Sequence, residues 1–234
     1  MCIIIAKNKT NRLPSIKELK YCFEYNSDGA GFMYTDNGKV IIDKGYMTEE
    51  DFLARFKTLC KKYNYFINKS LVIHCRIGTA GTNSAQNTHP YALTKKINKL
   101  HKTYTKASIG IAHNGIISDY QPHGNKDIND TQNFIRTYMT QRYKEDKDFY
   151  KRQWERTRIE EITNSKWAIL DKDDELYLIG LYTKENNLAF SNSNYKPHAY
   201  LYSGKSRGYG YDDYYYNYYD RVYGSLEDYD KDII

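Results

Sequence analysis

The hydrophobic positions near the start of the chain predict strands and helices in turn. A short apolar, β-branched run at residues 2–6 predicts a buried strand. Residues 14–25 instead carry apolar side chains at helical spacing. Two more strands are predicted at 32–34 and 39–44, because the hairpin signal Asp36-Asn37-Gly38 lies between them. The apolar positions of the predicted helix are Ile16, Leu19, Tyr21 and Phe23.

A second helix is predicted to begin after the N-cap Thr48 and to run to about Tyr63. Three acidic residues follow the cap in the first turn, where they interact favourably with the helix dipole. Residues 71–77 then alternate strictly, as a strand requires. One face carries Leu71, Ile73, Cys75 and Ile77, and the other carries Val72, His74 and Arg76. A histidine and a guanidinium therefore share one face at the end of this strand.

The strand is followed by a loop of small residues at 78–84, which lets the backbone approach a ligand. A fixed guanidinium beside such a loop suits a planar anion such as a carboxylate. The alternative for Arg76 is a salt bridge that closes the end of the strand.

The remaining pattern predicts a second group of elements. Residues 95–106 form a basic, polar connection. A helix is predicted over 128–143, beginning near Asp130 and Thr131, and the charged residues 144–161 either prolong it or form another helix. Further strands are predicted at 108–112, 167–170, 175–180, 188–191 and 200–202.

The predicted helices cluster between sets of strands rather than alternating with them one for one. This arrangement favours an α+β layered fold with antiparallel sheets. At residue 204 the composition changes to Tyr, Asp and Gly without aliphatic periodicity. We therefore expect one domain at 1–203 and a flexible or loosely docked tail at 204–234.

Composition narrows the classes of function. The chain has 234 residues, enough for one sizeable core, and no apolar run approaches the roughly 20 residues that span a bilayer. We expect no membrane contact, and a cytoplasmic location because no signal peptide is recognisable. The net charge of +6 is mild, and the basic residues are scattered among acids, which disfavours nucleic acid as a partner.

The four cysteines lack the spacing of a zinc site, so we expect no metal. Cys22, Cys60 and Cys75 are expected to be small buried side chains. Cys2 differs because it follows the initiator Met. Removal of Met1 leaves a thiol beside a free α-amine, whose pKa of about 8 suits a base near neutral pH. The alternative is that Cys2 is an ordinary buried residue.

Several motifs together resemble the glutaminase domains of class II (N-terminal nucleophile) glutamine amidotransferases. The segment HCRIGTAGTNSAQNTHPY at 74–91 looks most like that of amidophosphoribosyltransferases. IAHNGII at 111–117 and DTQ at 130–132 also resemble the family, which usually has DTE or DSE at the latter position. DGAG at 28–31, WAILDKDDELYLIG at 167–180 and FSNSNY at 190–195 add weaker support. The matching motifs span most of residues 2–195 in family order.

The resemblance implies a four-layer αββα sandwich of antiparallel sheets, as in N-terminal-nucleophile (Ntn) hydrolases, and hydrolysis of the glutamine side-chain amide without a cofactor. It implies that Cys2 attacks the γ-carbonyl and that its own amine moves the proton. It further implies an oxyanion hole made by the Asn114 side chain and the Gly115 N–H. Arg76 and the region of Thr79 then bind the α-carboxylate, and Asp130 binds the α-ammonium group. His74 and His113 are expected to be structural donors, and His89 part of a loop.

The chain departs from the family in three places. Asn26 and Ser27 stand where family members often have an Arg near the nucleophile, and Gln132 replaces an acid. No synthase domain is recognisable after Tyr202. The sequence thus favours a stand-alone glutaminase, acting on glutamine or a related small amide and able to supply ammonia to a separate protein partner. The alternatives are an Ntn amidohydrolase on another γ-glutamyl compound or small amide, and a catalytically idle protein that binds an amino acid or another protein.

Overall fold

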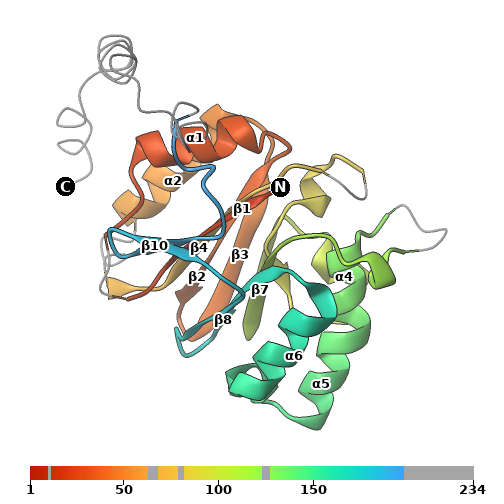
Figure 1. The fold of residues 1–234 in the computed structure, drawn as a ribbon. Helices are drawn as coiled ribbons and strands as arrows, with labels where there is room; N and C mark the ends of the chain where they lie inside the picture. The colour runs from red at the N-terminus through yellow and green to blue at the C-terminus, as the bar shows by residue number, and fades with distance from the viewer. Residues whose placement is uncertain (10–11, 63–67, 79–81, 123–126, 198–234) are drawn as a thin grey trace, which may run out of the picture.

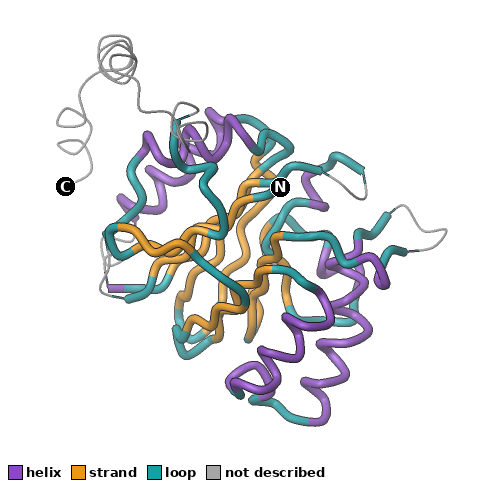
Figure 2. The backbone as a smooth tube through the Cα atoms, in the orientation of Figure 1, coloured by secondary structure: helices purple, strands orange, loops and turns teal. Residues whose placement is uncertain are grey.

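The computed structural model describes residues 1–9, 12–62, 68–78, 82–122 and 127–197. Over these residues the chain forms two antiparallel sheets with helices packed against them (Figure 1). Figure 2 shows the strands gathered in the middle and the helices toward the outside. The predicted α+β class with antiparallel sheets is therefore confirmed.

The larger sheet has seven strands in the order β10-β11-β1-β4-β2-β3-β6, and all neighbours are antiparallel. The central strands β1 and β4 correspond to the apolar run at the start of the chain and to the alternating segment. The predicted hairpin joins β2 to β3, with both Asn37 and Gly38 at positive φ (48° and 65°). The bounds are β10 Thr183–Glu185, β11 Leu188–Phe190, β1 Ile3–Lys7, β4 Leu71–Cys75, β2 Ala30–Asp36, β3 Lys39–Tyr46 and β6 Tyr104–Ala107.

The smaller sheet has four strands in the order β5-β7-β8-β9, again all antiparallel. Its two central strands, β7 and β8, are buried along nearly their whole length. The bounds are β5 Tyr91–Ala92, β7 Ile109–Asn114, β8 Lys166–Asp171 and β9 Leu176–Ile179.

The helices begin where local signals place them. In α1, the Ser15 hydroxyl accepts from the Glu18 N–H (3.2 Å) and the Glu18 carboxylate accepts from the Ser15 N–H (2.7 Å), which is a capping box. In α2, the Thr48 hydroxyl accepts from the Asp51 N–H, as its predicted cap role requires. The helices are α1 Ile16–Tyr25, α2 Glu49–Lys62, α3 Ile97–Leu100, α4 Asp130–Phe134, α5 Thr140–Glu145 and α6 Gln153–Thr163, with a π-helical turn at Ile135–Met139 between α4 and α5 and 3-10 turns at Ala85–Asn87, Ser118–Tyr120 and Phe149–Lys151.

Three hydrophobic cores lie one behind another. The first joins α1 and α2 to the outer face of the seven-stranded sheet and contains residues such as Leu19, Phe32 and Phe52. The second lies between the two sheets, where Val72 and Ala112 are buried. The third joins the four-stranded sheet to α4, α5 and α6 (Figure 1). Alternate residues of β4 enter the first and second cores, as the strict alternation of residues 71–77 predicts.

Some expected elements differ from the structure. Residues 95–106 are not simply a connection, because they contain α3 and much of the edge strand β6. Pairing with β3 creates this strand, and its side chains are mostly exposed, so it has no apolar pattern. The charged segment 144–161 forms the separate helix α6 after α5 ends at Glu145. The strand expected at 200–202 and the tail at 204–234 lie outside the described residues.

None of the helices in the described part of the chain is both long and apolar enough to cross a membrane.

Candidate active site

Cys2 lies opposite Arg76 at the end of the central strand pair. β1 and β4 pair with Ile3 opposite Cys75, so the next step of the register sets Cys2 against Arg76. The Ile77 N–H donates to the Cys2 Sγ at 3.4 Å, and the Ile77 carbonyl oxygen lies 3.5 Å from the same sulfur. Burial raises the pKa of the Cys2 thiol, while the Ile77 backbone and the charge of Arg76 oppose this rise.

The structure fixes Arg76 through both its backbone and its side chain. Its N–H donates to the Gly29 carbonyl (2.8 Å), and its own carbonyl accepts from the Asp28 N–H (2.9 Å). Its Nη1 donates to Asn83 Oδ1 at 3.3 Å. The Asp28 carboxylate in turn accepts from Asn83 Nδ2 (2.7 Å) and from the Gly78 N–H (2.6 Å). The buried guanidinium is therefore held by the loop that follows it, and a Cβ at Gly78 would lie only 2.9 Å from its Nη1.

Asn114 ends β7, and its side chain is tied to the first strand. Its Nδ2 donates to the Ser191 Oγ at 2.9 Å, and the same oxygen accepts from the Ile4 N–H at 2.8 Å. The Asn114 Oδ1 is buried and has no hydrogen-bond partner among the described residues. The next residue must be Gly115, because a Cβ there would lie 2.0 Å from the Ser165 hydroxyl.

Asp130 is buried at the start of α4. Its two carboxylate oxygens accept from the Ile117 N–H (2.7 Å) and the Thr131 N–H (2.8 Å). Burial raises the pKa of the Asp130 carboxyl group, and these backbone donors oppose the rise. Gln132 has a local role: with the N-cap Asn129 it forms a capping box, with both bonds at 2.9 Å. The Gln132 side chain thus stabilises the start of this helix.

Tyr91 lies where these groups converge. Its hydroxyl donates to the Asn87 carbonyl (2.7 Å) and accepts from Asn129 Nδ2 (2.8 Å), which ties α4 to β5. Burial raises the pKa of Tyr91, and the charges of Arg76, Asp130 and Cys2 all influence it. The three candidate residues therefore lie within electrostatic reach of one hydroxyl group, although they come from three distant segments.

Three histidines are buried beside these residues. The rings of His74 and His89 lie 4.2 Å apart between centroids, and those of His89 and His113 lie 6.3 Å apart. Burial lowers the pKa of His74 and of His113 to about 3 and lowers that of His89 further below its usual range. All three are neutral at neutral pH, so they do not add charge to the site.

Amide side chains contact the first two carbonyl groups of the chain. Asn192 Nδ2 donates to the Cys2 carbonyl at 2.6 Å. Asn194 Nδ2 lies 3.3 Å from both the Met1 carbonyl and Asn26 Oδ1. Asn26, which stands where family members often have an Arg, is fully buried and donates to the Cys22 carbonyl (2.8 Å).

The structure places Cys2 and Arg76 at the same end of the paired strands β1 and β4, and Ser191 links Asn114 to the backbone of β1. Asp130 lies at the start of α4, next to Asn129, which bonds to the Tyr91 hydroxyl. Gly115 follows Asn114, and Thr79 lies outside the described residues. The sequence did not assign roles to Ser191, Asn192, Asn194 or Tyr91. The first three lie in the FSNSNY segment, whose similarity to the family was the one signal that could have found them.

Within the described residues, no group of three or more His, Cys, Asp or Glu side chains is arranged to hold a metal ion. The scan against protein-family models and the search of curated proteins find no match to this chain.

Proposed function

We propose that this chain is a stand-alone class II glutaminase that hydrolyses the glutamine side-chain amide through a thioester on Cys2, after removal of Met1. The observation that supports the proposal is the contact between the Cys2 sulfur and the backbone of Ile77, the residue that follows Arg76, at the end of the paired strands β1 and β4. The order of layers, from helices through two antiparallel sheets to helices, supports the four-layer αββα sandwich of the Ntn-hydrolase class.

The proposed reaction begins with the free α-amine of Cys2, which takes the thiol proton. The sulfur attacks the γ-carbonyl carbon, and the carbonyl oxygen becomes an oxyanion. When this intermediate collapses, the C–N bond breaks and the amine returns the proton to the leaving ammonia. Water then attacks the γ-glutamyl thioester, which releases glutamate and restores the thiol. Burial raises the pKa of the Cys2 thiol overall, and the Ile77 N–H and the charge of Arg76 oppose part of this rise, so the transfer of the thiol proton depends on the α-amine.

A zwitterionic substrate fits the charges at the site. Arg76 forms a bidentate pair with the α-carboxylate, and Asp130 pairs with the α-ammonium group. Both side chains are almost completely buried, so water competes little for them. The Asp130 carboxylate is held by two backbone N–H groups and the Arg76 guanidinium by the Asn83 side chain, so little side-chain entropy is lost when the substrate binds.

The oxyanion hole uses Asn114 and the Gly115 N–H. As the structure stands, Asn114 Nδ2 bonds to Ser191 and Oδ1 has no partner among the described residues. Rotation of the Asn114 side-chain amide by about 180° exchanges the positions of Nδ2 and Oδ1. The Ser191 hydroxyl accepts from the Ile4 N–H, so its own proton can donate to Oδ1. The Asn114 NH₂ group is then available to the oxyanion.

The deciding experiment combines intact mass with labelling by a diazoketone analogue of glutamine. We expect the protein from its native host to lack Met1 and to gain one adduct on the Cys2 peptide. A Cys60→Ala variant serves as control: burial raises the pKa of Cys60 to about 11, so its removal leaves labelling unchanged. Retention of Met1 would block the amine and would favour the catalytically idle alternative, a protein that binds an amino acid or another protein.

The Cys2→Ala variant tests the nucleophile directly. It is expected to lower kcat by at least about 10⁴-fold, because the covalent step is lost. Glutamine binding, measured by calorimetry, is expected to persist, because Arg76 and Asp130 remain. Turnover that survives the substitution contradicts the assigned nucleophile.

A second candidate substrate is a γ-glutamyl amide with an apolar amine group. The observation in its favour is Ile77, whose backbone contacts the Cys2 sulfur and whose side chain is 37% exposed. The two substrates separate by kcat/KM for glutamine against γ-glutamyl anilides. The ammonia-accepting partner of the first candidate is a proposal that follows from its product.

A further inference from the structure

A line of buried hydrogen bonds crosses from α4 through β7 to β4. The Thr131 Oγ1 lies 2.8 Å from His113 Nδ1. The His74 Nε2 lies 2.9 Å from the His113 carbonyl oxygen. All three residues are at most 1% exposed. We call this line, Thr131–His113–His74, the relay.

The relay joins three structural layers that lie far apart in the sequence. Thr131 belongs to the helical layer, His113 to the four-stranded sheet and His74 to the seven-stranded sheet. Each member is also a near neighbour of one residue of the candidate site, and His74 shares its strand face with the residue two positions later. The pairs are Thr131 with Asp130, His113 with Asn114, and His74 with Arg76.

The chemistry of the relay fixes its protonation. A carbonyl oxygen only accepts, so the proton of neutral His74 is on Nε2. His113 packs its ring against Trp167, 4.1 Å away between centroids, which fixes the ring that meets Thr131. Neither histidine contacts the Cys2 sulfur through a hydrogen bond in the described structure, so the relay is not a route for the catalytic proton.

Loss of one partner in such a line is costly. A buried polar group that loses its hydrogen-bond partner destabilises the folded state, and the structure can recover that stability only by moving. Movement of α4, β7 or β4 would displace the residue of the site that the same element carries. A displacement of about 1 Å can lower a rate by about 100-fold.

We propose that Thr131, His113 and His74 are positioning residues that set the ammonium-binding, oxyanion-binding and carboxylate-binding groups of the site in register with one another. This inference rests on the proposed function for the roles of Asp130, Asn114 and Arg76. The relay acts through these three residues, and the Thr131 side chain in addition bonds directly to its neighbour Asp130, so the response of Asn114 and Arg76 is what distinguishes the relay from this local bond. Its role is to keep α4, β7 and β4 at fixed distances from one another.

The test uses Thr131→Val, which keeps the shape of the side chain and removes the hydroxyl, and Thr131→Ser, which restores it. The expected kcat/KM of Thr131→Val is lower by on the order of 10- to 100-fold, with contributions from both kcat and KM. Thr131→Ser is expected to recover most of the loss. Thr140→Val is the matched control, because its hydroxyl is also buried in this helical layer but donates only to the Arg136 carbonyl.

A double-mutant cycle tests the coupling across the two sheets. Thr131 and His74 do not contact each other, yet both act through His113. If the relay is one unit, Thr131→Val combined with His74→Gln lowers kcat/KM by less than the product of the two single effects. Effects that multiply independently contradict the relay.

A readout without turnover separates this inference from the proposed function. In nitrogen NMR spectra, Thr131→Val is expected to shift the His113 ring, the Asn114 side-chain amide and the Arg76 Nε–H resonances, whereas Thr140→Val leaves them in place. Unchanged Asn114 and Arg76 resonances in a folded Thr131→Val protein overturn the relay. If that variant does not fold, His113→Asn, which keeps a polar atom near the position of Nδ1, takes its place with the same readout. Absence of labelling at Cys2 overturns the glutaminase proposal and leaves this NMR result to decide the relay.

Discussion

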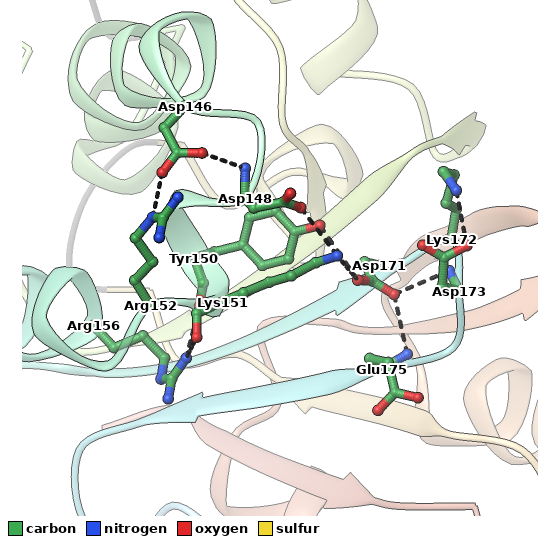
Figure 3. A network of polar contacts seen from close by, with 10 residues as sticks. All are labelled: Asp146, Asp148, Tyr150, Lys151, Arg152, Arg156, Asp171, Lys172, Asp173 and Glu175. Carbon is green, nitrogen blue, oxygen red and sulfur yellow. Dashed lines mark hydrogen bonds and ion pairs between the residues drawn. The ribbon is translucent and has the colours of Figure 1, made fainter.

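Two buried polar regions of this protein satisfy their hydrogen bonds in different ways. The first surrounds Asp171 at the end of β8 (Figure 3), where one carboxylate oxygen accepts from the Asp173 and Glu175 N–H groups and the other accepts from the Tyr150 hydroxyl. The second is the candidate site, where buried atoms of His74, His89, His113 and Asn114 have no partner among the described residues.

The two regions differ in whether a buried polar side-chain atom is left without a hydrogen-bond partner. None of the ten residues in Figure 3 has a buried polar side-chain atom without a partner. Such a network stabilises a turn and leaves nothing for a ligand. Buried polar atoms without partners are costly and therefore rare, and they tend to persist where a ligand or a reaction uses them. The contrast therefore gives Asp171 a structural role, whereas buried atoms without a partner among the described residues also occur at Tyr138, Glu155 and Tyr182 and do not by themselves mark a functional site.

The largest effect is expected for Asn114→Ala, which removes one of the buried side chains of the candidate site. If Asn114 stabilises the oxyanion, kcat falls by roughly 10²- to 10³-fold, because one such donor contributes about 3–4 kcal/mol. KM is expected to change little, because the donor acts on charge that develops in the transition state. Steady-state kinetics with glutamine measure both quantities. An effect on KM alone shows instead that Asn114 binds the ground state.

Asp171→Ala tests the other region, where every buried polar side-chain atom has a hydrogen-bond partner. We expect its free energy of unfolding to fall by about 3 kcal/mol, because two backbone N–H groups and the buried Tyr150 hydroxyl lose their acceptor. Urea denaturation measures this loss, and kcat is expected to stay unchanged. Asp173→Ala is the control, since its exposed side chain contacts only Lys172 and its loss leaves stability unaltered.

Acid is expected to lower the free energy of unfolding through the buried histidines of the candidate site. The pKa of His74 and of His113 is about 3 in the folded state, against about 6.5 when unfolded. Between these values the unfolded chain binds protons that the folded chain excludes. The free energy of unfolding therefore falls as pH drops from 6.5 toward 3, by at most about 1.4 kcal/mol per pH unit for each histidine.

Burial is the main reason that the pKa of His74 is low; the His113 carbonyl opposes this shift, and Arg76 and Lys44 add to it, while the neutral ring of His89 packs beside His74. Urea denaturation between pH 7 and 4 measures the slope. His113→Asn removes one titrating group, so its slope is expected to be smaller than that of the unmodified protein. Equal slopes show that His113 does not stay neutral in the folded state.

Arg76→Lys gives the smallest expected effect and refines the carboxylate contact. The charge remains, but the two-pronged geometry of the guanidinium is lost. We expect KM for glutamine to rise by about tenfold, with a smaller change in kcat. Arg136→Lys is the control, because Arg136 contacts a carbonyl at the exposed surface. A rise in activity toward glutamine in Arg76→Lys contradicts the proposed binding of the α-carboxylate by Arg76.

Local signals predicted much of the fold. The turn at Asp36-Asn37-Gly38, the cap at Thr48 and the alternation of 71–77 depend on neighbours in sequence, and the structure confirms them. The edge strands β6 and β10 and the two-residue β5 were not predicted. Exposed or very short strands have no apolar periodicity and form only because a partner strand is already in place.

The sequence by itself determined the candidate residues Cys2, Arg76, Asn114 and Asp130, because short motifs carry residue types whose chemistry is recognisable. Only the tertiary structure decided that Ser191 links Asn114 to the first strand, that Asn192 and Asn194 contact the start of the chain, and that His74, His89 and His113 are buried together. The physical reason is that these contacts join segments up to 193 residues apart. Which polar groups meet there depends on how two sheets and a helical layer pack, and no local pattern encodes that packing.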